Sequence, residues 1–179
     1  MPGNKSWACG ALAAVLCGCS PAADSGAQNA FVGNFGYIVT YPPGYSARAG
    51  WGDKAKTDEI VDFYPGKTAP ESSDAPGLVR LEARPVLGAS GQPIGLDELL
   101  RNMSAAMQRY GETYSVSAAT ATLPAMKVAI SDPKTPAKLY QVALRGKFVL
   151  YMFSSHDEAL ADAFASNLSE VQPTDRPGR

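Results

Sequence analysis

A six-residue stretch near the C-terminal end, Phe148–Phe153 (FVLYMF), limits the folds open to this chain most strongly. Successive side chains of a β-strand point to opposite faces of a sheet, and here the residues on both faces are apolar. A strand of this kind must be covered by protein on both of its faces. The sequence therefore predicts a layered fold, with a sheet lying between two other layers.

Two amphipathic segments can supply the covering layers. In residues 95–110, apolar side chains recur at helical spacing, and Gly111 is placed to terminate a helix. After the apolar strand, Ser155 and Glu158 form a capping box, which is typical of a helix N-terminus. We therefore expect one helix on each face of the sheet. The apolar stripe of the second helix comprises Leu160, Phe164, Leu168 and Val171.

Six further segments have the composition and length of strands. The pattern is clearest in Leu78–Val86, where apolar and charged residues alternate, so that this strand has one solvent-facing side. The preceding loop, Pro65–Pro76, is long, and such loops are either mobile or used for binding. The other expected strands are Phe35–Tyr41, Glu59–Tyr64, Thr113–Ala119, Ala125–Ser131 and Lys138–Arg145. Together these segments predict an α+β domain: an antiparallel β-sheet of about six or seven strands sandwiched between two helical layers.

The balance of charge excludes one class of partner. The chain has 179 residues, of which 16 are basic and 17 are acidic, and its net charge is -1. No basic stripe indicates nucleic-acid binding. A chain of this length fits one domain of ordinary size with a substantial core. We therefore expect a single domain that does not bind nucleic acid.

The N-terminal region has the organisation of an export signal. The apolar run at residues 7–18 has the length of a signal-peptide core and is well short of the ~20 residues that a membrane-spanning helix needs. Leu16, Gly18 and Cys19 resemble the lipobox of bacterial lipoproteins, although Cys17 stands where alanine or serine is usual. The resemblance implies cleavage between Gly18 and Cys19 and lipid attachment at Cys19. Two or three acyl chains would give a lasting membrane anchor, whereas one chain is marginal.

Two other interpretations of this segment stay open: a secreted protein cleaved near Ala23, and a cytosolic chain with an apolar start. A mature lipoprotein would keep one cysteine, so its core would have no internal disulfide. Ser20, in place of aspartate, resembles the signal that forwards lipoproteins to the outer membrane, so we expect the periplasmic face of that membrane if the organism has two. The expected regions are a signal peptide at 1–18, a flexible tether at 19–30, a folded domain at 31–172 and a disordered tail at 173–179.

Two strings resemble the PsbP-like family of domains. Gly36–Tyr45 (GYIVTYPPGY) is similar to the opening strand and the turn that follows it, and Lys147–Val171 is similar to the closing strand and helix of that family. The family includes extrinsic photosystem proteins, a Ran-binding nuclear import factor, DcrB-like periplasmic lipoproteins and secretion chaperones. The resemblance implies a sandwich fold and a protein that binds partners without catalysing a reaction.

Residues with catalytic or metal-binding potential are few. His156 is the single histidine, and it lies at an expected helix start, where we interpret it as a solvated group. The sequence has neither a G-x-S-x-G nucleophile elbow nor a phosphate-binding glycine loop, so we expect no enzyme activity and no cofactor. An acidic group could present oxygen ligands to calcium, but its spacing fits no EF-hand loop, and we expect no metal. This group comprises Asp53, Asp58, Glu59 and Asp62.

Two hypotheses of function follow. The first is a non-catalytic module of the cell envelope that binds a protein or peptide partner through aromatic side chains, since such side chains are enriched at contact surfaces. The same aromatics could instead close one end of the core. The alternative is an envelope hydrolase that acts on a glycan through the carboxylates of Asp58 and Asp62, which would have to lie ~5 to 10 Å apart in a concave site. The candidate partner-binding residues are Tyr41, Tyr45, Trp51 and Tyr64.

Overall fold

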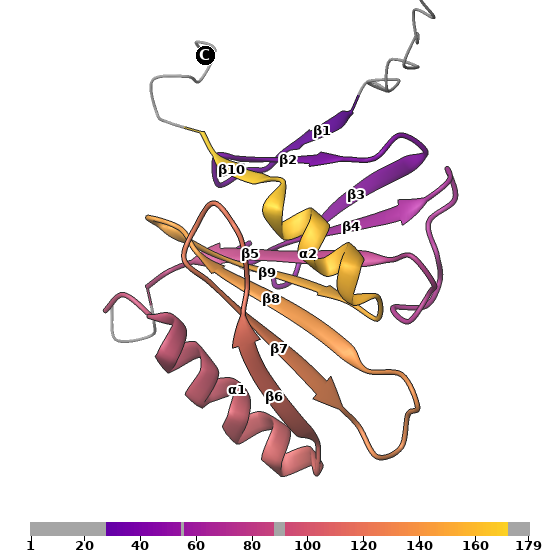
Figure 1. Cartoon of the computed structure of the whole chain (residues 1–179). Coiled ribbons are helices and arrows are strands. Elements are labelled where there is room, and N and C mark those ends of the chain that lie inside the picture. Colours follow the sequence, from indigo (N-terminus) through magenta and orange to yellow (C-terminus); the bar gives the residue numbers. More distant parts are fainter. Residues whose placement is uncertain (1–27, 55, 88–91, 172–179) are drawn as a thin grey trace, which may run out of the picture.

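The computed structural model describes residues 28–54, 56–87 and 92–171, which form two antiparallel sheets and two helices (Figure 1). The order of strands in the large sheet is β3 (Tyr45–Trp51), β4 (Glu59–Pro65), β5 (Val79–Pro85), β9 (Val149–Ser155), β8 (Leu139–Arg145), β7 (Ala125–Ser131) and β6 (Thr113–Ala118). The small sheet has the order β1 (Asn29–Val32), β2 (Tyr37–Tyr41) and β10 (Leu168–Glu170). The α+β class and the antiparallel sheet of seven strands are confirmed.

Strand β9 lies in the middle of the large sheet and is covered on both faces, as its apolar sequence predicts. Tyr151 and Phe153 are fully buried in one core cluster, while Leu150 is buried in a second cluster on the opposite face. Phe148 does not belong to the strand and is exposed. The requirement for cover on both sides therefore sets the order of the layers.

One face of the large sheet is covered by helix α2 (Glu158–Ser166) together with the small sheet (Figure 1). Phe164 of the helix packs against Phe63 of β4, with ring centroids 5.1 Å apart, and the buried Tyr37 of β2 belongs to the same cluster. The sequence did not predict this small sheet. The first expected strand pairs with β1 and β10 and lies outside the main sheet.

The opposite face carries helix α1 (Leu96–Tyr110), which packs over β7, β8 and β9 through Leu99 and Met107. Gly111 ends the helix in the left-handed conformation, with a φ of 73°, so the predicted terminator is confirmed. Tyr110, which the apolar stripe would place in the core, is 72% exposed. The helix thus covers one half of this face, and the half formed by β3, β4 and β5 carries charged side chains.

The second helix differs from its prediction at both ends. Its N-cap is Asp157, because the carboxylate of this residue accepts hydrogen bonds from the first-turn amides of Ala159 and Leu160. The helix ends at Ser166, and Leu168, expected on the helical stripe, is instead buried in β10 opposite Val39. Pairing with β2 therefore overrides the helical pattern of the sequence.

The expected tether overlaps the first described strand. Strand β1 starts at Asn29, so the last two residues of the expected tether, 19–30, pair with β2. The expected signal peptide at 1–18, the lipid-attachment residue Cys19 and the expected tail at 173–179 lie outside the described residues. In the ranges that are described, neither helix has the length and apolar character required to cross a bilayer.

Candidate functional site in a polar groove of the sheet

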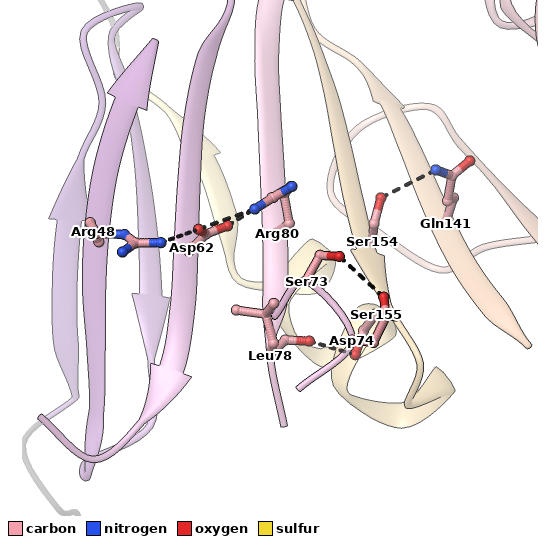
Figure 2. A network of polar contacts seen from close by, with 9 residues as sticks. All are labelled: Arg48, Asp62, Ser73, Asp74, Leu78, Arg80, Gln141, Ser154 and Ser155. Atoms are coloured by element: carbon pink, nitrogen blue, oxygen red, sulfur yellow. Dashed lines mark hydrogen bonds and ion pairs between the residues drawn. The ribbon is translucent and has the colours of Figure 1, made fainter. Parts of the chain in front are cut away.

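The half of the sheet that α1 does not cover is organised by a pair of arginines on one carboxylate. Arg48, Asp62 and Arg80 occupy neighbouring positions on β3, β4 and β5 (Figure 2). Arg80 donates from Nε to Asp62 Oδ1 at 2.8 Å and from Nη2 to Oδ2 at 3.2 Å, and Arg48 Nη2 donates to Oδ2 at 3.2 Å. The Asp62 carboxylate thus ties three strands together and holds the two guanidinium groups in place.

The side chains aligned with Arg48, Asp62 and Arg80 on the next two strands, β9 and β8, line a groove. Ser154 of β9 lies opposite Arg80, and Gln141 of β8 lies opposite Ser154, whose hydroxyl accepts a hydrogen bond from the Gln141 amide at 3.3 Å (Figure 2). These three side chains and Glu82 form the floor of a cavity of about 390 Å³. The rim is formed by Ser73, Asp74, Glu112, Asp132 and His156. A second cavity of about 440 Å³ adjoins it, and five residues line both cavities: Asp74, Thr135, Ala137, Ser155 and His156. We call this pair of cavities the sheet groove.

Acidic side chains outnumber basic ones in the sheet groove: Asp74, Glu82, Glu112 and Asp132 line it, against Arg80. Its arginine, Arg80, is bound to Asp62 and so already has a carboxylate partner. Glu82 lies in the electrostatic field of Arg80 but makes no direct hydrogen bond to it, and among the residues that the structure describes the Glu112 carboxylate has neither a hydrogen-bond nor an ion-pair partner. A ligand with positively charged or hydrogen-bond-donating groups would therefore find acceptors in this groove.

His156 and the nearby serines are held by other groups. The imidazole Nδ1 lies 2.8 Å from the carbonyl oxygen of Lys138, and Nε2 lies 3.5 Å from Asp74 Oδ1. Ser155 Oγ donates to the carbonyl oxygen of Leu78 at 2.9 Å. A serine nucleophile needs a histidine nitrogen that can take its proton. Within the described ranges no serine hydroxyl is hydrogen-bonded to His156, so these groups are arranged to hold the loops that border the groove.

The four candidate aromatics do not form one surface. Tyr41 and Tyr45 are half-buried and pack on the core, with ring centroids 5.2 Å from Phe63 and 5.7 Å from Phe164, respectively. Trp51 lies at the other end of β3 and is 39% exposed. Tyr64 is buried, at 7% exposure. It points to the same face of β4 as Asp62, opposite to the face of Phe63. Contact of any one of them with a partner stays a prediction.

The carboxylates of the acidic group also diverge. Asp58 lies just before β4, whereas Asp62 lies within the strand, where its carboxylate is already bound by two arginines. Glu59 is fully buried on the other face, where its carboxylate accepts a hydrogen bond from Tyr37. Within the described residues, no three potential metal ligands converge.

The structure brings together groove residues that sequence reasoning missed, chiefly Glu82, Gln141 and Ser154. The alternation in the third expected strand places Glu82 on a solvent-facing side, but no local sequence pattern indicates which strands lie beside it.

Comparisons with known proteins add no further candidate, because no protein-family model matches the chain and a search of curated proteins found no match.

The Asp62 carboxylate predicts how stability depends on pH. Burial alone would raise its pKa, but hydrogen bonds from Arg80 and Arg48 and their positive charges outweigh burial, so the pKa lies below the usual 3.8. A depressed pKa in the folded state adds stability above pH 3.8, and this contribution is lost as the pH falls below that value.

We therefore expect Asp62→Asn to lower the free energy of unfolding by ~1 to 2 kcal/mol at pH 7, and by less at pH 3. Urea unfolding at the two pH values measures both differences. A variant whose loss of stability is the same at pH 3 and pH 7 would contradict the assignment.

Proposed function

We propose that this chain is a lipid-anchored lipoprotein of the cell envelope whose PsbP-like domain acts as a non-catalytic binding or accessory module for a protein or peptide partner. The anchor rests on the resemblance of residues 16–19 to a lipobox. In an organism with two membranes the domain would lie at the periplasmic face of the outer membrane. The PsbP-like assignment draws support from the central antiparallel sheet and from the helix that follows its apolar strand β9.

The observation that carries the binding role is the sheet groove. Its floor is built from three adjacent strands, β5, β9 and β8, which makes it a rigid surface, and acidic side chains outnumber basic ones in its lining. Rigid, preformed sites lose little conformational entropy when a ligand binds. A segment of a partner that carries lysine or arginine would supply positive charge to balance the excess of acidic side chains in the groove.

The groove predicts charge-selective peptide binding. We expect the mature chain to bind a fluorescent lysine-rich ten-residue peptide more tightly than a glutamate-rich peptide of equal length. The double variant Glu82→Gln/Glu112→Gln should weaken this binding by about 5- to 20-fold, because each solvent-accessible ion pair contributes up to ~1 kcal/mol. Fluorescence anisotropy at low and at physiological salt measures the change.

Asp97→Asn/Glu98→Gln is the matched control, since it removes the same charge from exposed positions in the first turn of α1, outside the groove lining. This control should keep its affinity for the lysine-rich peptide within about twofold. Equal losses in the two double variants would show that binding follows net charge alone, and the groove would then not be the site.

A further inference from the structure

Strand β6 is an open edge of the large sheet. It is the last strand in the sheet order and pairs with β7 only, and all six of its residues, Thr113–Ala118, are exposed (Figure 1). An edge strand presents backbone N–H and C=O groups on its free side, and these groups can pair with another extended chain. The chemistry that fits this edge is therefore a second β-strand.

The sequence of β6 has no residue of the kinds that protect an edge strand from pairing with another chain. Proteins usually protect edges with charged residues, proline or a bulge, whereas β6 (TYSVSA) has no charged residue and no proline. The other edge of the sheet, β3, carries Arg48 in an ion pair with Asp62. The two edges thus differ in how readily they accept a further strand.

Exposed apolar side chains gather at the same edge. Tyr114 and Val116 of β6 are 38% and 45% exposed, and Tyr110, at the end of α1 just before the strand, is 72% exposed. Tyr114 and Val116 point to the same face of the strand, which is the face that α1 covers, because the Tyr114 hydroxyl lies 2.8 Å from Ser104 Oγ of that helix. Apolar groups beside free backbone groups are typical of a strand-addition site.

We propose that β6 pairs with β6 of a second copy of this chain, antiparallel and about a two-fold axis at Ser115. In this register Tyr114 lies opposite Val116 of the other copy, and Thr113 lies opposite Ser117. An aromatic residue opposite a β-branched residue is a favourable cross-strand pair. The contact is isologous, so the two copies form a closed dimer with one continuous sheet.

The charge pattern favours a second copy over an unrelated charged strand. In the proposed register the nearest charged residue, Glu112, lies opposite Ala118, so like charges do not meet. A basic or acidic partner strand would find no opposite charge on β6. The proposal depends on the edge alone and holds whether or not Cys19 carries a lipid.

The test uses cysteine substitutions on β6 in the full-length chain whose Cys9, Cys17 and Cys19 are replaced by serine, produced in cells and oxidised with a mild catalyst. At the axis, Ser115 and its counterpart would have Cα atoms ~4.5 to 5.5 Å apart, which suits a disulfide. Ser117 and its counterpart would be four residue steps apart, roughly 13 Å, which is out of reach. We therefore expect Ser115→Cys to form a disulfide-linked dimer on a non-reducing gel, and Ser117→Cys and the unsubstituted chain to stay monomeric.

A third and a fourth variant test the side-chain pair. Val116→Lys, added to Ser115→Cys, places a charge opposite Tyr114 and should reduce the dimer at least about tenfold, because a charge at an edge strand opposes pairing. Val116→Thr, which keeps a β-branched residue, should retain the dimer.

The proposal would be overturned if Ser115→Cys stayed monomeric while its thermal unfolding matched that of the unsubstituted chain. Equal cross-linking at positions 115 and 117 would also overturn it, as would a cross-link from position 115 to a different protein. The thermal unfolding midpoint of each variant confirms that the domain is folded before the gel is interpreted.

Discussion

Replacing Cys19 with serine is expected to abolish lipid attachment, because the sulfur of that residue is the proposed site of acylation. A single myristoyl chain gives a membrane association constant of only ~10⁴ M⁻¹, and stable attachment requires a second chain. Loss of all chains should therefore move the mature protein from the membrane fraction to the soluble fraction. Metabolic labelling with a palmitate analogue, followed by mass spectrometry of the N-terminal peptide, measures lipid attachment directly.

An uncleaved signal peptide could hold the serine variant at the membrane, so the variant is also placed behind an ordinary cleavable secretory signal. Residues 19–179 with serine at position 19 should then be soluble. Cys17→Ala is the matched control: alanine is usual at this place in a lipobox, and the variant should be labelled like the original chain. Label on the Cys19→Ser chain, or none on the original, would contradict the anchor.

Local patterns in the sequence were sufficient for elements whose own residues determine them. The helix at 96–110 has an apolar stripe and a terminating Gly111, and both features act within a few residues. Strand β5 shows its alternation in a single segment, and its apolar side is buried as predicted. The apolar strand β9 required cover on both faces, and this one requirement predicted the layered arrangement.

Elements that depend on distant partners were missed. Strand β3 (YSARAGW) has small and polar residues without regular alternation, and it is a strand because β4 pairs with it along its whole length. Leu168 fits a helical stripe but pairs with Val39, more than 100 positions earlier in the sequence. Tertiary contacts override local propensity in both cases.

The candidate site could not be predicted from local sequence patterns either, because its residues come from strands that are distant in sequence. The floor of the sheet groove combines Arg80, Gln141 and Ser154, which are neighbours only because β9 lies between β5 and β8. No spacing in the sequence encodes that order of strands. The aromatic residues were grouped by their closeness in sequence, yet Tyr45 and Trp51 lie at opposite ends of one strand. Residues that are close in sequence can still lie far apart when they belong to one β-strand, because each residue advances the chain by ~3.3 Å.

Replacing Glu59 with alanine is expected to lower the free energy of unfolding by ~2 to 4 kcal/mol, because buried hydrogen-bond donors would lose their acceptor. The Glu59 carboxylate is fully buried and accepts hydrogen bonds from the Asn34 backbone amide at 3.0 Å, from the Asn34 side chain at 2.6 Å and from the Tyr37 hydroxyl at 3.0 Å. Burial and the adjacent Glu59 raise the pKa of Tyr37, which keeps its hydroxyl protonated as a donor. Urea unfolding at pH 7 measures the loss.

A second substitution separates the energetic cost of leaving the Tyr37 hydroxyl without an acceptor from the cost of lost packing. Glu59→Leu should cost nearly as much as Glu59→Ala, because it leaves the same hydroxyl without an acceptor. Adding Tyr37→Phe removes that hydroxyl, and the double variant Glu59→Leu/Tyr37→Phe should recover ~1 to 3 kcal/mol, since replacing both partners with apolar groups can be nearly neutral. Glu82→Ala is the matched control and should change stability by less than ~0.5 kcal/mol, because this carboxylate lies on the solvent-facing side of β5 and its interaction with Arg80 is not a direct hydrogen bond. If Glu59→Leu were as stable as the original chain, Glu59 would not be the group that joins the small sheet to β4.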